Sequence, residues 1–174
     1  MKAVPTPQLN QPAPPFQLPD LEGRLHDLMD FRGQVVILNF WSAECPWSER
    51  VDRELLDLVK RWGSDVALLP IASNANEGLE LLSSTAAARG IPRVLIDADQ
   101  RVADLYGAQT TPHFFVIDRE GYLRYQGAFD DVTFRKRTPR EQYLKAAVEA
   151  VLGGRQPDPA ETPPYGCALV RFSL

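Results

Sequence analysis

The sequence of 174 residues contains only two cysteines and two histidines. Cys45 and Cys167 are too few to build a disulfide scaffold, and neither has the spacing of metal ligands. We therefore expect no metal site and no cofactor. In a reducing cytosol, isolated cysteines of this kind are more often catalytic, redox-sensing or inert than structural.

The sequence also lacks a long hydrophobic run and an excess of basic residues. No apolar stretch approaches the ~20 residues that a membrane span needs, and the first 19 residues have no apolar core of a secretory signal. We expect a cytoplasmic protein with no membrane partner. The net charge is −4, and no basic stripe interleaved with aromatic residues indicates nucleic-acid binding. The short run at 135–137 is typical of a solvated loop.

The rest of the composition is that of an ordinary globular protein, with 44% hydrophobic and 24% charged residues. Proline is concentrated at both ends, where it favours extended chain over helix. This distribution predicts three segments: an extended lead-in at 1–16, one domain at 17–154, and a proline-rich tail at 155–174 that carries Cys167.

Between the two ends, strand and helix patterns alternate. Apolar runs predict strands over 34–40, 65–72, 93–96 and 110–118, with a hairpin return at 122–125. Apolar residues at helical spacing, with their caps, predict helices over 46–62, 76–89, 100–106 and 139–152, the last of them capped by Thr138. This order predicts an α/β fold with a central mixed β-sheet flanked by helices on both faces.

Cys45 follows the first apolar strand directly and precedes a helix that begins with Pro46. The unpaired amides and positive dipole of a helix start favour a thiolate over a thiol, and the thiolate is the reactive form. In an α/β sheet, the carboxyl end of a central strand is also the usual place for a site. The alternative is that Cys45 is an inert core cysteine.

Three motifs carry a resemblance to known proteins: Phe40-Trp41, Cys45-Pro46-Trp47-Ser48 and Thr111-Pro112. In this order they resemble the thioredoxin-like superfamily, and within it the redoxin or peroxiredoxin-like (AhpC/TSA-type) thiol-disulfide oxidoreductases. The resemblance covers roughly residues 14–152 and implies a thioredoxin-like fold. It also implies that the Thr111–Pro112 bond is cis and close to Cys45, so that the backbone of Thr111 could align an extended substrate.

The resemblance is incomplete at the second sulfur. Ser48 stands where a dithiol relative carries its resolving cysteine, and serine cannot form a disulfide. Ser48 could instead donate a hydrogen bond to the Cys45 thiolate. Cys167 could supply the resolving thiol if the tail folds back, although a disulfide demands specific geometry. The other interpretation is that Cys167 has no partner.

Two neighbours of the motifs are further candidates. Trp47 is expected to be an exposed, apolar docking surface for a partner. His113 follows the proline, so it could polarise Cys45 or act as an acid or base. The alternative is that His113 is a strand residue bonded to the backbone.

The leading hypothesis is therefore a thiol-disulfide oxidoreductase that uses Cys45 as a single nucleophile. Its partners would be protein or low-molecular-weight thiols and disulfides, with an external thiol as reductant. One alternative is a redox-inactive thioredoxin-fold module that binds peptides. Another is a one-cysteine peroxidase, which is disfavoured because the arginine that peroxidatic relatives hold beside their thiolate is absent.

Overall fold

The centre of the computed structural model, which describes residues 7–173, is a five-stranded mixed sheet. Its strand order is β5-β4-β3-β7-β8, with β3 parallel to β4 and antiparallel to β7. The bounds are β3 Val35–Trp41, β4 Val66–Ala72, β5 Leu95–Ile96, β7 Phe114–Ile117 and β8 Leu123–Gly127. The predicted mixed sheet is confirmed. All seven side chains of β3 are buried, as expected for a strand covered on both faces.

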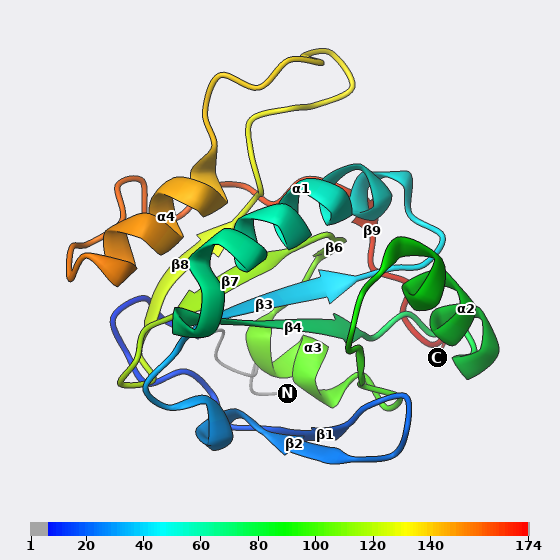
Figure 1. Cartoon of the computed structure of the whole chain (residues 1–174). Helices are drawn as coiled ribbons and strands as arrows, with labels where there is room; N and C mark the ends of the chain where they lie inside the picture. Colours follow the sequence, from blue (N-terminus) through cyan, green and yellow to red (C-terminus); the bar gives the residue numbers. More distant parts are fainter. Residues whose placement is uncertain (1–6, 174) are drawn as a thin grey trace.

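Helices cover the two faces of this sheet (Figure 1). Helices α1 (Pro46–Trp62) and α4 (Tyr143–Leu152) pack on one face. Helix α3 (Arg101–Tyr106) packs on the other, together with the hairpin of β1 (Gln17–Pro19) and β2 (Leu25–Asp27) and the 3₁₀ turn η1 (Leu28–Phe31). Helix α2 (Leu79–Arg89) packs near the carboxyl ends of β3 and β4.

Helix α1 holds Cys45 at its start and has the predicted bounds. Pro46 occupies its first turn, where the missing N–H costs no helical hydrogen bond. Val51, Leu55 and Leu58 form the buried stripe that packs on the sheet. The helix ends at Trp62. Its C-cap is Gly63, whose φ of 64° is available to glycine at low cost and which begins the short turn η2 (Gly63–Asp65).

Other boundaries differ from the prediction. Helix α4 begins at Tyr143, and Gln142 rather than Thr138 is its N-cap. The carboxylate of Asp131 accepts hydrogen bonds from the backbone N–H groups of Arg140 and Glu141, which holds this stretch in a loop. Helix α2 begins at Leu79, three residues later than predicted. The β1–β2 hairpin was not predicted, because its strands are only three residues long.

The tail returns across the domain and adds a small second pair of strands. β9 (Cys167–Ala168) pairs antiparallel with β6 (Thr110–Thr111), which precedes β7. The red segment in Figure 1 follows this path past the start of α1. The predicted segment boundaries stay predictions, and residues 1–6 of the lead-in lie outside the described residues.

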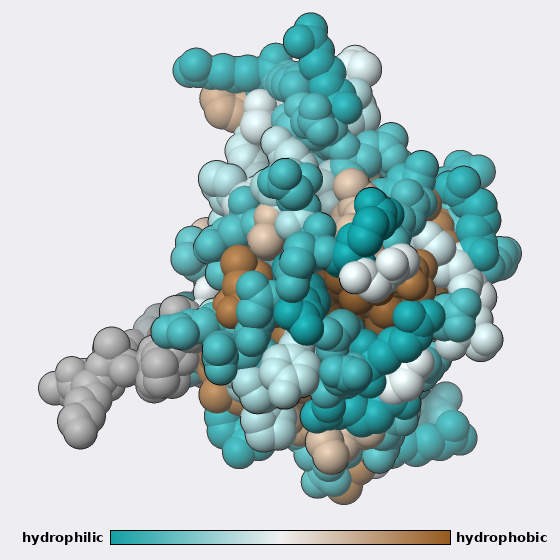
Figure 2. Space-filling model, turned by 90° about the vertical axis from the view of Figure 1, so that its left-hand side faces the viewer, coloured by the Kyte–Doolittle hydropathy of each residue, from teal (hydrophilic) through white to brown (hydrophobic). Residues whose placement is uncertain are grey.

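Hydrophilic residues cover most of the face shown in Figure 2, and hydrophobic residues appear there only in small patches. The loop between β8 and α4 projects at the top of both views. Within residues 7–173, no helix combines the length and apolar character that crossing a bilayer requires.

Candidate functional site

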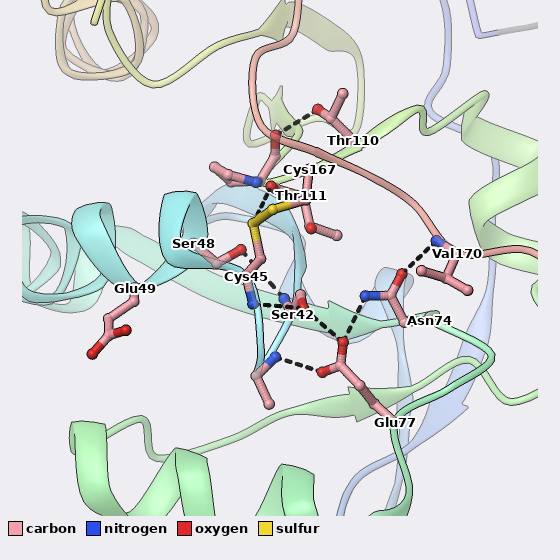
Figure 3. The surroundings of a disulfide bond; sticks show 12 residues. Ser42, Cys45, Ser48, Glu49, Asn74, Glu77, Thr110, Thr111, Cys167 and Val170 are labelled. Atoms are coloured by element: carbon pink, nitrogen blue, oxygen red, sulfur yellow. Dashed lines mark hydrogen bonds between the residues drawn. A yellow bond between two sulfur atoms is a disulfide. The ribbon is translucent and has the colours of Figure 1, made fainter. Parts of the chain in front are cut away.

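Cys45 and Cys167 are joined by a disulfide bond, although 122 residues separate them in the sequence. Their Cα atoms lie 6.1 Å apart, which is within the usual range for a disulfide. Figure 3 shows the bond between the first turn of α1 and the returning tail. The site is therefore a bonded pair of cysteines rather than the single sulfur of the leading hypothesis.

A network of polar side chains positions the loop that leads into α1. The backbone N–H of Cys45 donates to Ser42 Oγ over 3.1 Å, and Ser42 Oγ donates to Glu77 over 2.6 Å. Glu77 also accepts from the N–H of Ala43 and from the side-chain amide of Asn74. One carboxylate, placed after β4, thus holds the loop that carries Cys45 (Figure 3).

Ser48 is fully buried and lies beside this loop. Its hydroxyl accepts a hydrogen bond from the N–H of Ser42 over 3.3 Å. In the disulfide form, Ser48 therefore supports the loop. Its predicted hydrogen bond to a Cys45 thiolate belongs to the reduced form and stays a prediction.

The peptide bond between Thr111 and Pro112 is cis. The carbonyl oxygen of Thr111 lies 3.1 Å from Cys45 Sγ. In the disulfide this sulfur carries no proton, so the approach is a contact rather than a hydrogen bond. Thr111 is also paired directly with Cys167 in the β6–β9 register. Both ends of the disulfide are thus held against the same residue.

Further contacts fix the tail beyond Cys167. Leu169 is buried, and its N–H donates to the carbonyl of Gln109. The N–H of Val170 donates to Asn74 Oδ1 over 2.8 Å, and the Val170 carbonyl accepts from the side chain of Gln100 over 2.7 Å. Asn74 therefore joins the tail to Glu77 and, through it, to the Cys45 loop (Figure 3).

Trp47 is half-buried beneath the tail, in contrast to the exposed docking surface that we expected. The ring of Tyr165 packs against it edge to face, with 4.9 Å between the ring centroids. The guanidinium of Arg50 lies 5.9 Å from the same ring. A partner could reach the whole Trp47 ring only after this part of the tail moved.

His113 has the geometry of the structural alternative rather than of an acid or base. Its Nδ1 accepts a hydrogen bond from the N–H of Gln109, and its ring stacks on Phe115 at 4.6 Å. Burial lowers the pKa of His113 to about 4, so the imidazole is neutral at neutral pH. Its hydrogen bond to Gln109 and its stacking on Phe115 indicate a structural role rather than a role at Cys45.

A small pocket of about 130 Å³ opens beside the disulfide. Both cysteines line it, together with residues from the Cys45 loop, from the segment after β4 and from the tail: Ser42, Glu44, Asn74, Asn76, Glu77, Ala168 and Val170. Cys45 itself is only 3% exposed, whereas Cys167 is half-buried. Among residues 7–173, no group of three or more histidine, cysteine or carboxylate side chains could hold a metal ion.

Comparison with known proteins decides the family. Residues 9–126 match the AhpC/TSA family. The chain belongs to this family. The thiol-disulfide oxidoreductase ResA of Geobacillus thermodenitrificans is 34% identical over 116 residues, which are 64% of each chain. This chain thus spans less than two thirds of that relative. The thiol:disulfide interchange protein DsbE of Allochromatium vinosum is 29% identical over 72% of this chain and 69% of its own.

Two solved structures of high similarity cover nearly the whole chain. The crystal structure of a hypothetical protein from Sinorhizobium meliloti 1021 is 32% identical, covers 98% of both chains and has a TM-score of 0.88. An uncharacterized conserved protein from Geobacillus kaustophilus is 28% identical, over 96% of this chain and 94% of its own, also with a TM-score of 0.88. The AhpC/TSA match itself ends at residue 126, before the tail that carries Cys167.

Glu77 and Asn74 are functional candidates that the sequence analysis missed. They follow the strand predicted at 65–72, and Glu77 was placed within the helix predicted from residue 76. The carboxyl ends of neighbouring parallel strands meet at one edge of a sheet. A polar segment directly after β4 was therefore a signal for side chains that approach Cys45 at the end of β3.

Proposed function

We propose that this protein is a thiol-disulfide oxidoreductase in which Cys45 is the nucleophile and Cys167 is the resolving cysteine. The observation that carries the proposal is the Cys45–Cys167 disulfide, placed at the start of α1 and against Thr111. Similarity to the oxidoreductase ResA and the interchange protein DsbE supports the reaction class. Cys167 thus does what the second cysteine does in dithiol relatives, which carry it at the position of Ser48.

The proposed cycle has three exchange steps. The Cys45 thiolate attacks a substrate disulfide, forms a mixed disulfide and releases one substrate thiolate. The Cys167 thiolate then attacks Cys45 Sγ, which forms the internal disulfide and releases the second substrate thiol. An external reductant with two thiols breaks the internal disulfide and is itself oxidised to a disulfide.

The two cysteines differ in position in a way that supports this assignment. Cys45 is the N-cap of the 17-residue helix α1, where the helix dipole stabilises a thiolate as nucleophile or leaving group. Cys167 lies in a two-residue strand of the tail. The backbone of Thr111 lies beside Cys45 and pairs with the tail at Cys167, and this edge is the proposed aligning element for substrate.

Trapping distinguishes this cycle from the redox-inactive peptide-binding alternative. With an excess of a disulfide-bonded protein such as insulin, the Cys167→Ser variant should accumulate a mixed disulfide at Cys45. Cys45→Ser should accumulate none, and the wild type should accelerate insulin reduction by a thiol reductant. Capture of insulin without a covalent bond, and without acceleration, would favour the peptide-binding module.

The peroxidase alternative requires a different intermediate. A hydroperoxide would convert Cys45 to a sulfenic acid before Cys167 condensed with it. Mass spectrometry of Cys167→Ser after a hydroperoxide pulse measures this species. We expect disulfide exchange to be much faster than sulfenic-acid formation. The cytoplasmic location stays a prediction, and it implies that a cellular thiol system supplies the reductant.

A further inference from the structure

The tail segment 165–169 occupies the edge where the proposed function places an extended substrate. Cys167 pairs with Thr111, and Ala168 pairs with Thr110. The sulfur of Cys167 is bonded to Cys45. Backbone pairing at Thr111 together with a disulfide to Cys45 is the arrangement of a peptide captured as a mixed disulfide.

We infer that this groove selects extended peptides in which glycine directly precedes the cysteine, and that 165–169 is a built-in copy of such a substrate. The inference rests on the proposed function and names its substrate class. It follows from the space around the tail backbone.

Gly166 lies where no side chain fits. A Cβ atom built on Gly166 would overlap the carbonyl oxygen of Thr111, and it would lie 2.7 Å from the Thr111 carbonyl carbon and 3.0 Å from Pro112 N. All three atoms are backbone, so no side chain can rotate away. Gly166 is not among the glycines with positive φ, so it is needed here for space rather than for conformation. A peptide bound in this register must also have glycine at that position.

The neighbouring positions extend the pattern. Before the glycine, the ring of Tyr165 packs on Trp47. After the cysteine, Ala168 is exposed, which leaves this position open to other side chains. Leu169 is 7% exposed and packs into the hydrophobic cluster on the face of the sheet that α3 covers. The preferred substrate is therefore an extended segment of the form aromatic, glycine, cysteine, any residue, aliphatic.

A peptide exchange reaction tests this preference on the full chain. In Cys167→Ser, Cys45 is first converted to its mixed disulfide with thionitrobenzoate. The thiolate of an added peptide attacks Cys45 Sγ, forms a peptide–Cys45 disulfide and releases thionitrobenzoate, whose absorbance gives the rate. The matched peptides are acetyl-Tyr-Gly-Cys-Ala-Leu-amide and acetyl-Tyr-Ala-Cys-Ala-Leu-amide. The reaction of each peptide with the free aryl disulfide reagent corrects for intrinsic thiol reactivity.

We expect the glycine peptide to react at least tenfold faster after this correction. Equal corrected rates, or rates no faster than a small thiol of the same reactivity, overturn the inference and leave the proposed function intact. If Cys45 of the reduced variant does not react with the aryl disulfide reagent at all, the proposed function fails instead.

The tail itself provides a second test. Gly166→Ala should shift the equilibrium of the Cys45–Cys167 disulfide with glutathione at least tenfold toward the reduced form. Gly78→Ala is the matched control, because a Cβ at Gly78 meets no atom within 4 Å. An unchanged equilibrium in Gly166→Ala, measured by alkylation and mass spectrometry, would contradict the steric argument.

Discussion

The ring of Tyr165 meets the indole of Trp47 edge to face, with 4.9 Å between the ring centroids. Trp47 is the second residue of α1, two positions after Cys45, and Tyr165 is two positions before Cys167. The disulfide thus has one aromatic residue beside each of its cysteines, Trp47 in α1 and Tyr165 in the tail. The Tyr165 hydroxyl also accepts a hydrogen bond from the N–H of Phe134 over 2.9 Å. This contact links the tail to the loop before α4.

Removing the Tyr165 ring should make the disulfide easier to reduce. An aromatic pair of this geometry contributes about 0.5–1.5 kcal/mol beyond its buried area. We expect Tyr165→Ala to increase the rate of reduction by dithiothreitol several-fold, because the tail separates more readily from α1. Tyr165→Phe keeps the ring and loses only the hydroxyl, so its rate should stay much closer to that of the wild type. Equal rates in Tyr165→Ala and the wild type would show that the ring does not hold the tail.

Reducing the disulfide should lower the stability of the whole domain. The bond closes a loop of 122 residues, and the loss of chain entropy in the unfolded state is worth on the order of 4–5 kcal/mol for a loop of this size. Thermal unfolding followed by circular dichroism should show a lower midpoint with a phosphine reductant than without it. The double variant Cys45→Ser/Cys167→Ser should unfold at the lower midpoint under both conditions.

Glu77→Gln should destabilise the loop that carries Cys45. The carboxylate of Glu77 accepts hydrogen bonds from Ser42, Ala43 and Asn74, and a glutamine would direct an NH₂ group at one or more of these donors. A polar group left without its hydrogen bond costs about 1–3 kcal/mol. Urea unfolding should give a loss of free energy of this size. Glu80→Gln changes an exposed carboxylate three residues further along the chain, in α2, and should have little effect.

Burial of His113 should make stability depend on pH. The folded-state pKa is about 4, below the ordinary value of 6.5, because burial disfavours the charged imidazolium. The unfolded chain therefore binds a proton first as the pH falls. The free energy of unfolding is therefore unaffected by His113 above pH 6.5. It falls as the pH is lowered from 6.5 toward 4, by a total on the order of 3 kcal/mol. His113→Asn should remove this part of the pH dependence. Unfolding free energies at pH 7 and pH 4.5, compared between the two proteins, measure it.

Much of the scaffold could be predicted from local patterns. The buried strand before Cys45 and the 17-residue helix after it have sharp signals: a continuous apolar run, a proline at the helix start and an apolar stripe at helical spacing. Helix α4 was placed too early, because Thr138-Pro139 has the pattern of a helix start, while Asp131 binds the following backbone in a loop. A local capping pattern was overridden by a contact from several residues upstream.

The site was only half predictable for a related reason. Cys45 was identified from the local junction of strand and helix, whereas Thr111 and Pro112 were placed beside it only through the resemblance to thioredoxin-like proteins. His113 and Trp47 were singled out because they adjoin the motifs in sequence. Their surroundings could not be predicted, because His113 is buried against Phe115 and Trp47 packs against Tyr165 of the tail. Glu77 and Asn74 belong to a third segment, which approaches Cys45 only because β3 and β4 are parallel and end at the same edge.

The sequence alone determined that a cysteine lies where a buried strand passes into a helix, since that junction is encoded within about 20 consecutive residues. Only the tertiary structure decided what this cysteine is bonded to. Pairing over 122 residues depends on the sum of distant contacts: the β6–β9 register, the close approach at Gly166, and the hydrogen bonds that join Val170 to Asn74 and Gln100. No local period in the sequence encodes such contacts.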